Sequence, residues 1–208
     1  MDAPPRPRGR TLATLTLALA LASAGCGTPP WQASQSPTPA PSASATPTPV
    51  VNDLAKGSLK RTLRAGAAVL DVSYWSTLDL GQWTPGVPKP LNVVVTATLE
   101  GGAKGQQTFL SAARASTTAT GADGVPQVLD AVDDSASVAP GYLISKPNSY
   151  QQVLTLPAAP AGSTSVRITL TYELLIQSAP KADTYLRQAT SDTIEVPLAT
   201  APAATTTP

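Results

Sequence analysis

Apolar and polar residues alternate through most of the chain between residues 58 and 198, and no segment keeps a helical period. The longest alternation covers residues 165–177. Because neighbouring side chains of a β-strand point to opposite faces, this segment predicts a central strand with one face in the core. The predicted inward residues include Ile168, Leu170 and Tyr172. Leu175 is the one apolar residue on the outward face, and we expect a neighbouring segment to cover it.

Residues 69–76 and 91–100 alternate in the same way, and Tyr74 falls on the predicted inward face. The glycine-rich segment 101–105 predicts a hairpin between 91–100 and 106–115, with Phe109 as its inward anchor. Weaker strands are predicted at 59–64, 128–132, 142–145, 151–156, 184–188 and 193–198.

Many short strands separated by glycine and proline turns, with no helix for parallel crossovers, predict a single antiparallel β-sandwich. The pair 165–177 and 193–198 resembles the closing strands of immunoglobulin-like and fibronectin-like sandwiches. That resemblance is one of pattern, since the disulfide and tryptophan signature of antibody domains is absent. We therefore expect an all-β domain over residues 50–200 and a disordered tail over 201–208.

The segment before this domain, residues 26–49, has the composition of a disordered linker. Seven prolines lie between Thr28 and Pro49, among serine, threonine and alanine. Proline blocks helices and regular sheet pairing. Residues 28–49 could span about 65 Å in polyproline II geometry, so the linker is predicted to act as a stalk. The same composition is typical of O-glycosylated stalks.

The first residues have the organisation of a secretory signal. Three arginines, Arg6, Arg8 and Arg10, precede the apolar segment 11–22, and small residues follow up to Cys26. The apolar segment is too short to span a bilayer, which takes about 20 residues. The pattern therefore predicts export across the membrane, with a signal peptide over residues 1–25.

Residues 23–26, Ser-Ala-Gly-Cys, resemble the lipobox of bacterial lipoproteins. The resemblance implies that Cys26 carries a lipid and becomes the mature N-terminus, so that the protein is held on the outside of a membrane. Ser23 departs from the leucine that the family usually has three residues before its cysteine. Cleavage after Ala24 by ordinary signal peptidase, leaving a free thiol, is the alternative.

Charge excludes one class of partner. Charged residues make up 13% of the chain, against roughly 25% in ordinary soluble domains. Removal of the signal leaves 11 basic and 12 acidic residues and a net charge of −1. Without a basic surface to displace counterions, nucleic acid is not an expected partner.

The absence of histidine and the single cysteine limit the chemistry further. The usual general base near neutral pH and the commonest metal ligand are both missing. Catalytic sites that combine serine or cysteine with histidine, and histidine–zinc sites, are excluded. We expect no cofactor, no metal and no enzymatic activity.

Three weaker patterns could indicate chemistry. Ser178 and Lys181 have the spacing of the Ser-x-x-Lys motif of penicillin-binding enzymes, but they follow a predicted strand, so a turn is favoured. Three clustered aspartates could collect calcium, although their spacing fits no calcium loop and a solvated loop is favoured: Asp130, Asp133 and Asp134. No two of the remaining candidate carboxylates form an evident glycosidase pair: Asp71, Asp79, Glu100, Glu173 and Glu195.

Two tryptophans are the candidate ligand contacts. Trp75 points opposite Tyr74, so it is either exposed on a sheet face or covered by a loop. Trp83 lies in the glycine- and proline-rich loop 76–90, where it either closes the core or contacts a ligand. Exposed indole faces suit the apolar side of a sugar ring.

The sequence thus predicts a lipid-anchored protein of the bacterial cell envelope with a binding or structural module. Two alternatives stay open. One is a carbohydrate-binding or glycan-processing protein, which would need Trp75 and Trp83 clustered and exposed. The other is an accessory subunit that docks on an envelope protein through a sheet edge.

Overall fold

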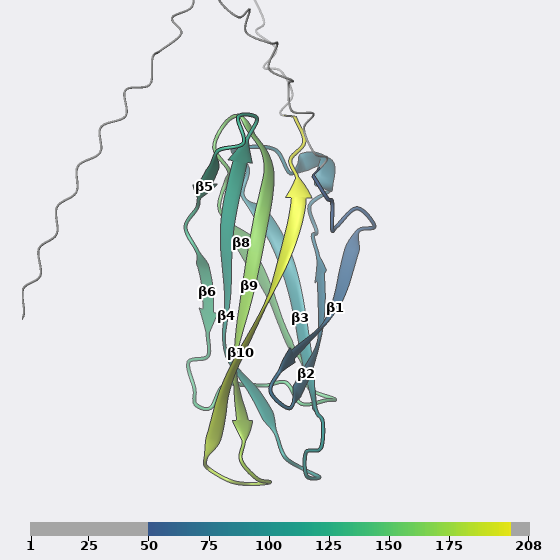
Figure 1. Cartoon of the computed structure of the whole chain (residues 1–208), viewed down its shortest axis with the longest axis vertical. Helices are drawn as coiled ribbons and strands as arrows, with labels where there is room; N and C mark the ends of the chain where they lie inside the picture. The colour runs from purple at the N-terminus through teal and green to yellow at the C-terminus, as the bar shows by residue number, and fades with distance from the viewer. Residues whose placement is uncertain (1–49, 201–208) are drawn as a thin grey trace, which may run out of the picture. The chain divides into compact units, whose positions relative to one another are not determined.

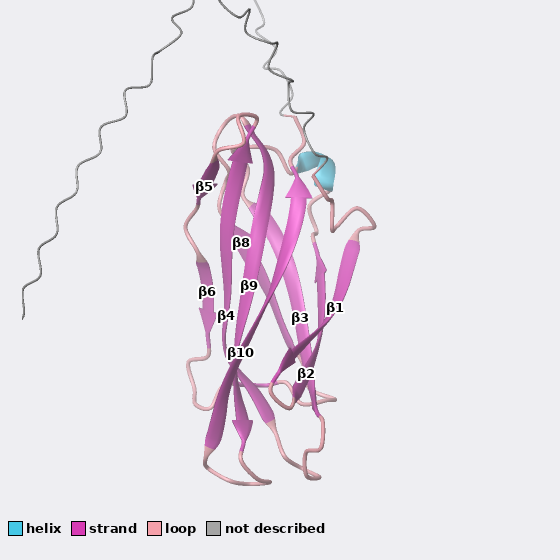
Figure 2. Ribbon diagram, in the orientation of Figure 1, coloured by secondary structure: helices cyan, strands magenta, loops and turns pink. Residues whose placement is uncertain are grey.

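A computed structural model describes residues 50–200 of the protein, and these residues form two antiparallel sheets packed face to face (Figures 1 and 2). The first sheet contains β1 (Ser58–Ala65), β2 (Ala68–Trp75), β3 (Lys89–Leu99) and β8 (Tyr150–Leu156), in that order. The second contains β10 (Tyr185–Pro197), β9 (Ser163–Gln177) and β4 (Thr108–Gly121). Three short strands pair with the far edge of β4: β5 (Pro126–Val128), β6 (Val132–Ser135) and β7 (Tyr142–Leu143). The predicted β-sandwich is confirmed.

The strand order shares part of the immunoglobulin arrangement, with one strand added at the edge of the first sheet. β2, β3 and β8 are adjacent, as strands A, B and E are in that fold, and β10, β9 and β4 are adjacent, as strands G, F and C are. β1 is the addition, paired with β2 through a two-residue turn at Gly66 and Ala67. The positive φ of 58° at Gly66 is what a tight hairpin turn requires and glycine supplies at little cost.

The strongest sequence prediction, the central strand at 165–177, is confirmed. β9 lies between β10 and β4 and pairs with both of them over most of its length. Its inward side chains are buried: Ile168, Leu170 and Tyr172 are all 0% exposed. In the first sheet, Leu70, Val72 and Tyr74 are buried and Asp71 is exposed, as the alternation predicts.

The predicted hairpin between 91–100 and 106–115 is wrong. β3 pairs with β2 and β8, whereas β4 pairs with β9, so the turn at 101–105 carries the chain from one sheet to the other. Alternation shows which face of each strand is buried, but two strands that face one core have the same pattern whether or not they pair.

The prediction of Phe109 as an inward anchor is also wrong. Leu110 points into the core and is 0% exposed, so Phe109, next to it, lies half-buried on the outer face of the second sheet. A register shift between Leu110 and Ala112 marks a bulge just after this point. Such a bulge reverses the phase of the alternation, which a strict period of two does not anticipate.

Two strand boundaries differ from the predictions. The segments 184–188 and 193–198 belong to one strand, β10, because β9 offers an unbroken partner along its whole length. The predicted strand 128–132 is instead divided between β5 and β6. Gly141 then brings β7 close to β4, because any Cβ at this position, with φ 137°, would lie 2.3 Å from the Leu110 carbonyl oxygen.

The core lies between the two sheets and is built mainly from aliphatic side chains, and its largest fully buried side chains are those of Trp83, Tyr74 and Tyr172. The only helix among residues 50–200 is a single 3-10 turn, Leu80–Gln82. No helix in this part of the chain is long and apolar enough to cross a membrane.

Leu170→Ala should lower the free energy of unfolding by about 2 to 5 kcal/mol, because it removes a fully buried side chain from β9. Thr169→Ala is the matched control, since Thr169 lies half-buried on the outer face and its hydroxyl contacts only that of Thr193, at 3.3 Å. We expect the control to lose about 1 kcal/mol or less. Urea denaturation of both variants measures the difference, and equal midpoints would contradict the face assignment.

Candidate functional site

Trp83 is part of the core, which agrees with the first of its two predicted roles, closing the core, and not with contact to a ligand. Its side chain is 0% exposed, and its indole Nε1 donates a hydrogen bond to Ser76 Oγ over 3.2 Å. Its backbone carbonyl accepts a hydrogen bond from Ala199, so the loop is tied to the end of the domain. In this structure no face of the indole is open to a ligand.

Lys89 fixes the same loop, and the sequence analysis did not single it out. Its side chain is almost completely buried, and its amine donates to the backbone carbonyls of Thr84, at 2.9 Å, and Val87. Burial lowers the pKa of this amine. Lys89 lies between two prolines at the start of a strand, and the sequence there contains no pattern that would predict whether its side chain is buried or exposed.

Trp75 lies half-buried on the outer face of the first sheet, between Ser58 of β1 and Asn92 of β3. Asn92 is itself buried, and its side-chain amide donates to the Trp75 carbonyl over 3.4 Å. The two tryptophans are therefore not clustered on one exposed surface. The arrangement that a carbohydrate site at Trp75 and Trp83 requires is not present among the described residues.

The candidate carboxylates on the strands are separated, each beside its own cation. The ion pairs join Asp71 to Lys146, Glu100 to Arg64, Glu173 to Arg187 and Glu195 to Arg167. Asp79 instead accepts a hydrogen bond from the Gly81 backbone at the start of the 3-10 turn, at 2.7 Å. Arg64 lowers the pKa of Glu100 through their hydrogen bonds. No hydrogen bond or ion pair among the described residues joins two of these carboxylates.

The aspartates at 130–134 do not converge. Asp133 forms an ion pair with Arg114, at 3.2 Å, and Asp134 accepts a hydrogen bond from the Tyr150 hydroxyl over 2.7 Å. Residues 50–200 contain no group of three side chains placed to hold a metal ion. Asp134 thus has a structural contact that its place in an acidic segment did not predict.

Ser178 and Lys181 lie in the turn between β9 and β10, as the alternative to the Ser-x-x-Lys motif predicts. The Ser178 hydroxyl is hydrogen-bonded to that of Thr184, and Lys181 has a positive φ of 63°. No helix begins at Ser178, so the geometry of that catalytic motif is absent at this position.

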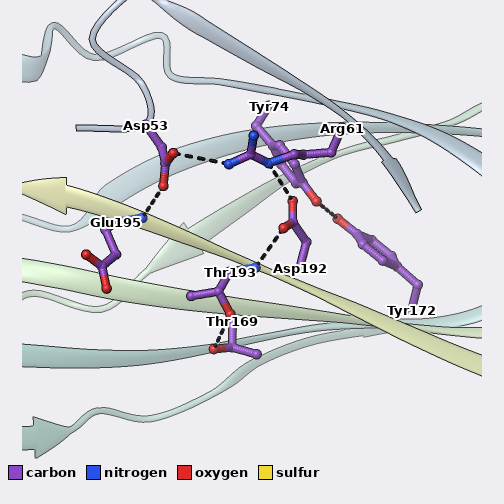
Figure 3. A network of polar contacts seen from close by, with 8 residues as sticks. All are labelled: Asp53, Arg61, Tyr74, Thr169, Tyr172, Asp192, Thr193 and Glu195. Atoms are coloured by element: carbon purple, nitrogen blue, oxygen red, sulfur yellow. Dashed lines mark hydrogen bonds and ion pairs between the residues drawn. The ribbon is translucent and has the colours of Figure 1, made fainter. Parts of the chain in front are cut away.

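A polar network crosses the seam between β1 and β10 (Figure 3). The Tyr172 hydroxyl donates to that of Tyr74 over 3.1 Å, which joins the two sheets through the core. Asp192 lies beside Tyr74, and its Oδ2 is 3.7 Å from Arg61 Nε. Burial, above all, raises the pKa of both phenols, and the Asp192 carboxylate adds to this, so both hydroxyls stay protonated.

Asp53 extends the network to the first described residues. Its carboxylate accepts from Arg61 Nη2, at 3.2 Å, and from the Glu195 backbone, at 2.8 Å. Its own backbone N–H donates to the Glu195 carbonyl over 2.9 Å. Asp192 Oδ2 makes no hydrogen bond to a described residue, although it forms an ion pair with Arg61 Nε. The network is suited to holding the sheets together.

The sequence analysis missed an apolar patch on the outer face of the second sheet. It consists of Phe109, Leu143, Leu175 and Tyr185, each half-buried, and is called the Phe109 patch below. The rings of Phe109 and Tyr185 meet edge to face, with centroids 5.9 Å apart. The sequence contains one indication of this patch, which is Leu175, the one apolar residue on the outward face of β9. Phe109, which pairs with Leu175, is predicted from the sequence to face the core.

Cys26, the predicted lipidation site, lies outside the described residues, as do the signal peptide, the linker and the tail at 201–208. Their assignment stays a prediction.

Trp83→Ala should lower the free energy of unfolding by about 3 to 5 kcal/mol, because it removes a large, fully buried side chain. Trp75→Ala should cost less, since Trp75 is half-buried on a sheet face. Thermal and urea denaturation measure both. If Trp83→Ala leaves stability unchanged, the indole does not close the core.

Tyr74→Phe should destabilise the domain more than Tyr172→Phe. The first change leaves the buried Tyr172 hydroxyl without its acceptor, at a cost of about 1 to 3 kcal/mol. The second leaves the Tyr74 hydroxyl beside the Asp192 carboxylate, which can still accept its proton. Urea denaturation compares them, and the reverse order of stability would contradict this network.

Comparison with protein-family models and with curated proteins finds no match to this chain.

Proposed function

We propose that the chain is a lipid-anchored protein of the bacterial cell envelope whose β-sandwich is a binding or structural module. The observation that carries the proposal is the position of Cys26. The only cysteine of the chain directly follows an apolar segment preceded by arginines, at the end of a sequence similar to a lipobox. A lone cysteine in an exported protein calls for such an explanation.

The order of the segments supports an anchored module. A signal is followed by the cysteine, by a segment rich in proline, serine, threonine and alanine, and then by the sandwich, whose first strand begins at Ser58. The linker could place the domain about 65 Å from the membrane if it is extended. Two or three acyl chains on Cys26 would give firm attachment, which a single chain does not.

The proposal of a non-catalytic module rests on how the polar side chains are used. The carboxylates that could serve as acids or bases are paired with arginine or lysine, or accept backbone hydrogen bonds. The buried amine of Lys89 binds backbone carbonyls. These contacts fit structural roles, and the chain has no histidine to act as a general base.

Radiolabelled palmitate supplied to the producing bacterium should enter the wild-type protein and not Cys26→Ser. The variant lacks the only thiol that can carry the lipid, so it should leave the membrane fraction. Incorporation is measured in the immunoprecipitated protein. Thr28→Ser is the control, because it alters a nearby hydroxyl residue and leaves the thiol in place.

Equal labelling of wild type and Cys26→Ser would overturn the anchor. So would an unmodified mature N-terminus at Gly25, which would show that ordinary signal peptidase cleaves the chain after Ala24.

A further inference from the structure

We propose that the Phe109 patch binds a neutral glycan of the cell envelope. The proposal deepens the proposed function, on which it rests, by naming a ligand class for the binding module. It places the site on the second sheet, away from both Trp75 and Trp83.

The patch is a continuous row across four strands. Cα pairing places Leu143 of β7 next to Phe109 of β4, Phe109 next to Leu175 of β9, and Leu175 next to Arg187 of β10. Tyr185 lies two residues before Arg187 on the same face and contacts the Phe109 ring at an interplanar angle of 82°. This arrangement presents aromatic and aliphatic carbon at the surface, which suits the apolar face of a sugar ring.

Three polar side chains lie beside these apolar residues: Arg187, Glu173 and Ser111. Arg187 and Glu173 form an ion pair at 3.2 Å, and their side chains are 71% and 45% exposed. The Ser111 hydroxyl is close by and donates to the Glu173 carbonyl over 3.1 Å. The ion pair joins Arg187 Nη1 to Glu173 Oε2, which leaves Arg187 Nη2 and Glu173 Oε1 without a partner among the described residues and able to bind adjacent sugar hydroxyls. Since the two charges cancel, an uncharged ligand fits the site best.

The size of the patch favours a small ligand over a second copy of the chain. Four strands span about 14 Å and two residues of one face span about 7 Å, so the patch covers on the order of 100 Å². A stable protein interface buries about 800 Å² on each partner. The patch is therefore too small to hold a dimer by itself, but a few sugar units need no more.

The patch lies far along β9 from Val50, the first described residue. Val50, where the linker joins the domain, lines a hollow with Ser165 at one end of β9. Leu175 lies ten residues further along this strand, about 33 Å away. Figure 1 shows the described chain entering at the upper end of the sandwich, and the patch strands β9 and β10 meeting at the lower end.

The test uses the full-length chain in detergent and three uncharged probes: cellohexaose, maltohexaose and mannohexaose. Isothermal titration calorimetry should show binding of at least one probe. Arg187→Ala and Tyr185→Ala should each weaken it by about tenfold or more, since each removes a bonding group or a stacking surface. Arg167→Ala is the matched control, because Arg167 also pairs with a glutamate, Glu195, on the same face, and it should change affinity by less than about twofold.

Arg187 is a surface residue, so its variant should fold even if Tyr185→Ala does not. Failure of the wild type to bind any probe would overturn the proposal, as would equal losses in Arg187→Ala and Arg167→Ala. A dimer in sedimentation that Tyr185→Ala dissociates would also overturn it and make the patch a protein interface. Because the assay needs no membrane, failure of palmitate labelling at Cys26 would reject the anchor and leave a positive glycan result standing.

Discussion

Buried tyrosine hydroxyls join the two sheets, and the sandwich depends on their having partners. A tyrosine ring contributes apolar area to the core, but its hydroxyl must be hydrogen-bonded when it leaves water. At the β1–β10 seam, Tyr172 donates to Tyr74, which lies beside Asp192. At the opposite seam, Tyr150 of β8 donates to Asp134 of β6. At each side of the sandwich a carboxylate thus lies beside one of these hydroxyls.

This arrangement assigns structural work to residues that could otherwise suggest catalysis. Asp134 belongs to an acidic segment, yet it serves the Tyr150 hydroxyl, and burial together with this aspartate raises the pKa of that phenol. Lys89 is a buried amine, yet it holds backbone carbonyls of the loop that carries Trp83. In the folded protein the Asp134 carboxylate and the Lys89 amine are therefore engaged in hydrogen bonds within the domain. The groups left available at the surface lie on the outer faces of the sheets, where the Phe109 patch is.

Strand positions could be predicted because alternation reports burial directly. Ile168, Leu170 and Tyr172 point inward because each is two residues from the next on a strand with one buried face. Pairing could not be predicted in the same way, since β3 and β4 face one core from different sheets. The bulge after Leu110 shifts the phase of the alternation, so the sequence places Phe109 on the wrong face of its strand. For this reason the sequence does not predict the contact between the rings of Phe109 and Tyr185. The sequence places Trp83 in its loop, but only the fold shows that the loop is tied to Ala199, far along the chain, and that the indole is buried.

The sequence by itself determined the all-β class and the inward face of the long strands, and it predicts an export signal that ends just before Cys26. These depend on local order: a period of two, the spacing of prolines, and a cysteine directly after an apolar segment. The tertiary structure alone decided which strands pair, which tyrosines share a hydrogen bond, and that Phe109, Leu143, Leu175 and Tyr185 form one surface. These residues come from four strands, and only the register between strands brings them together, because no local pattern encodes a neighbour that lies dozens of residues away.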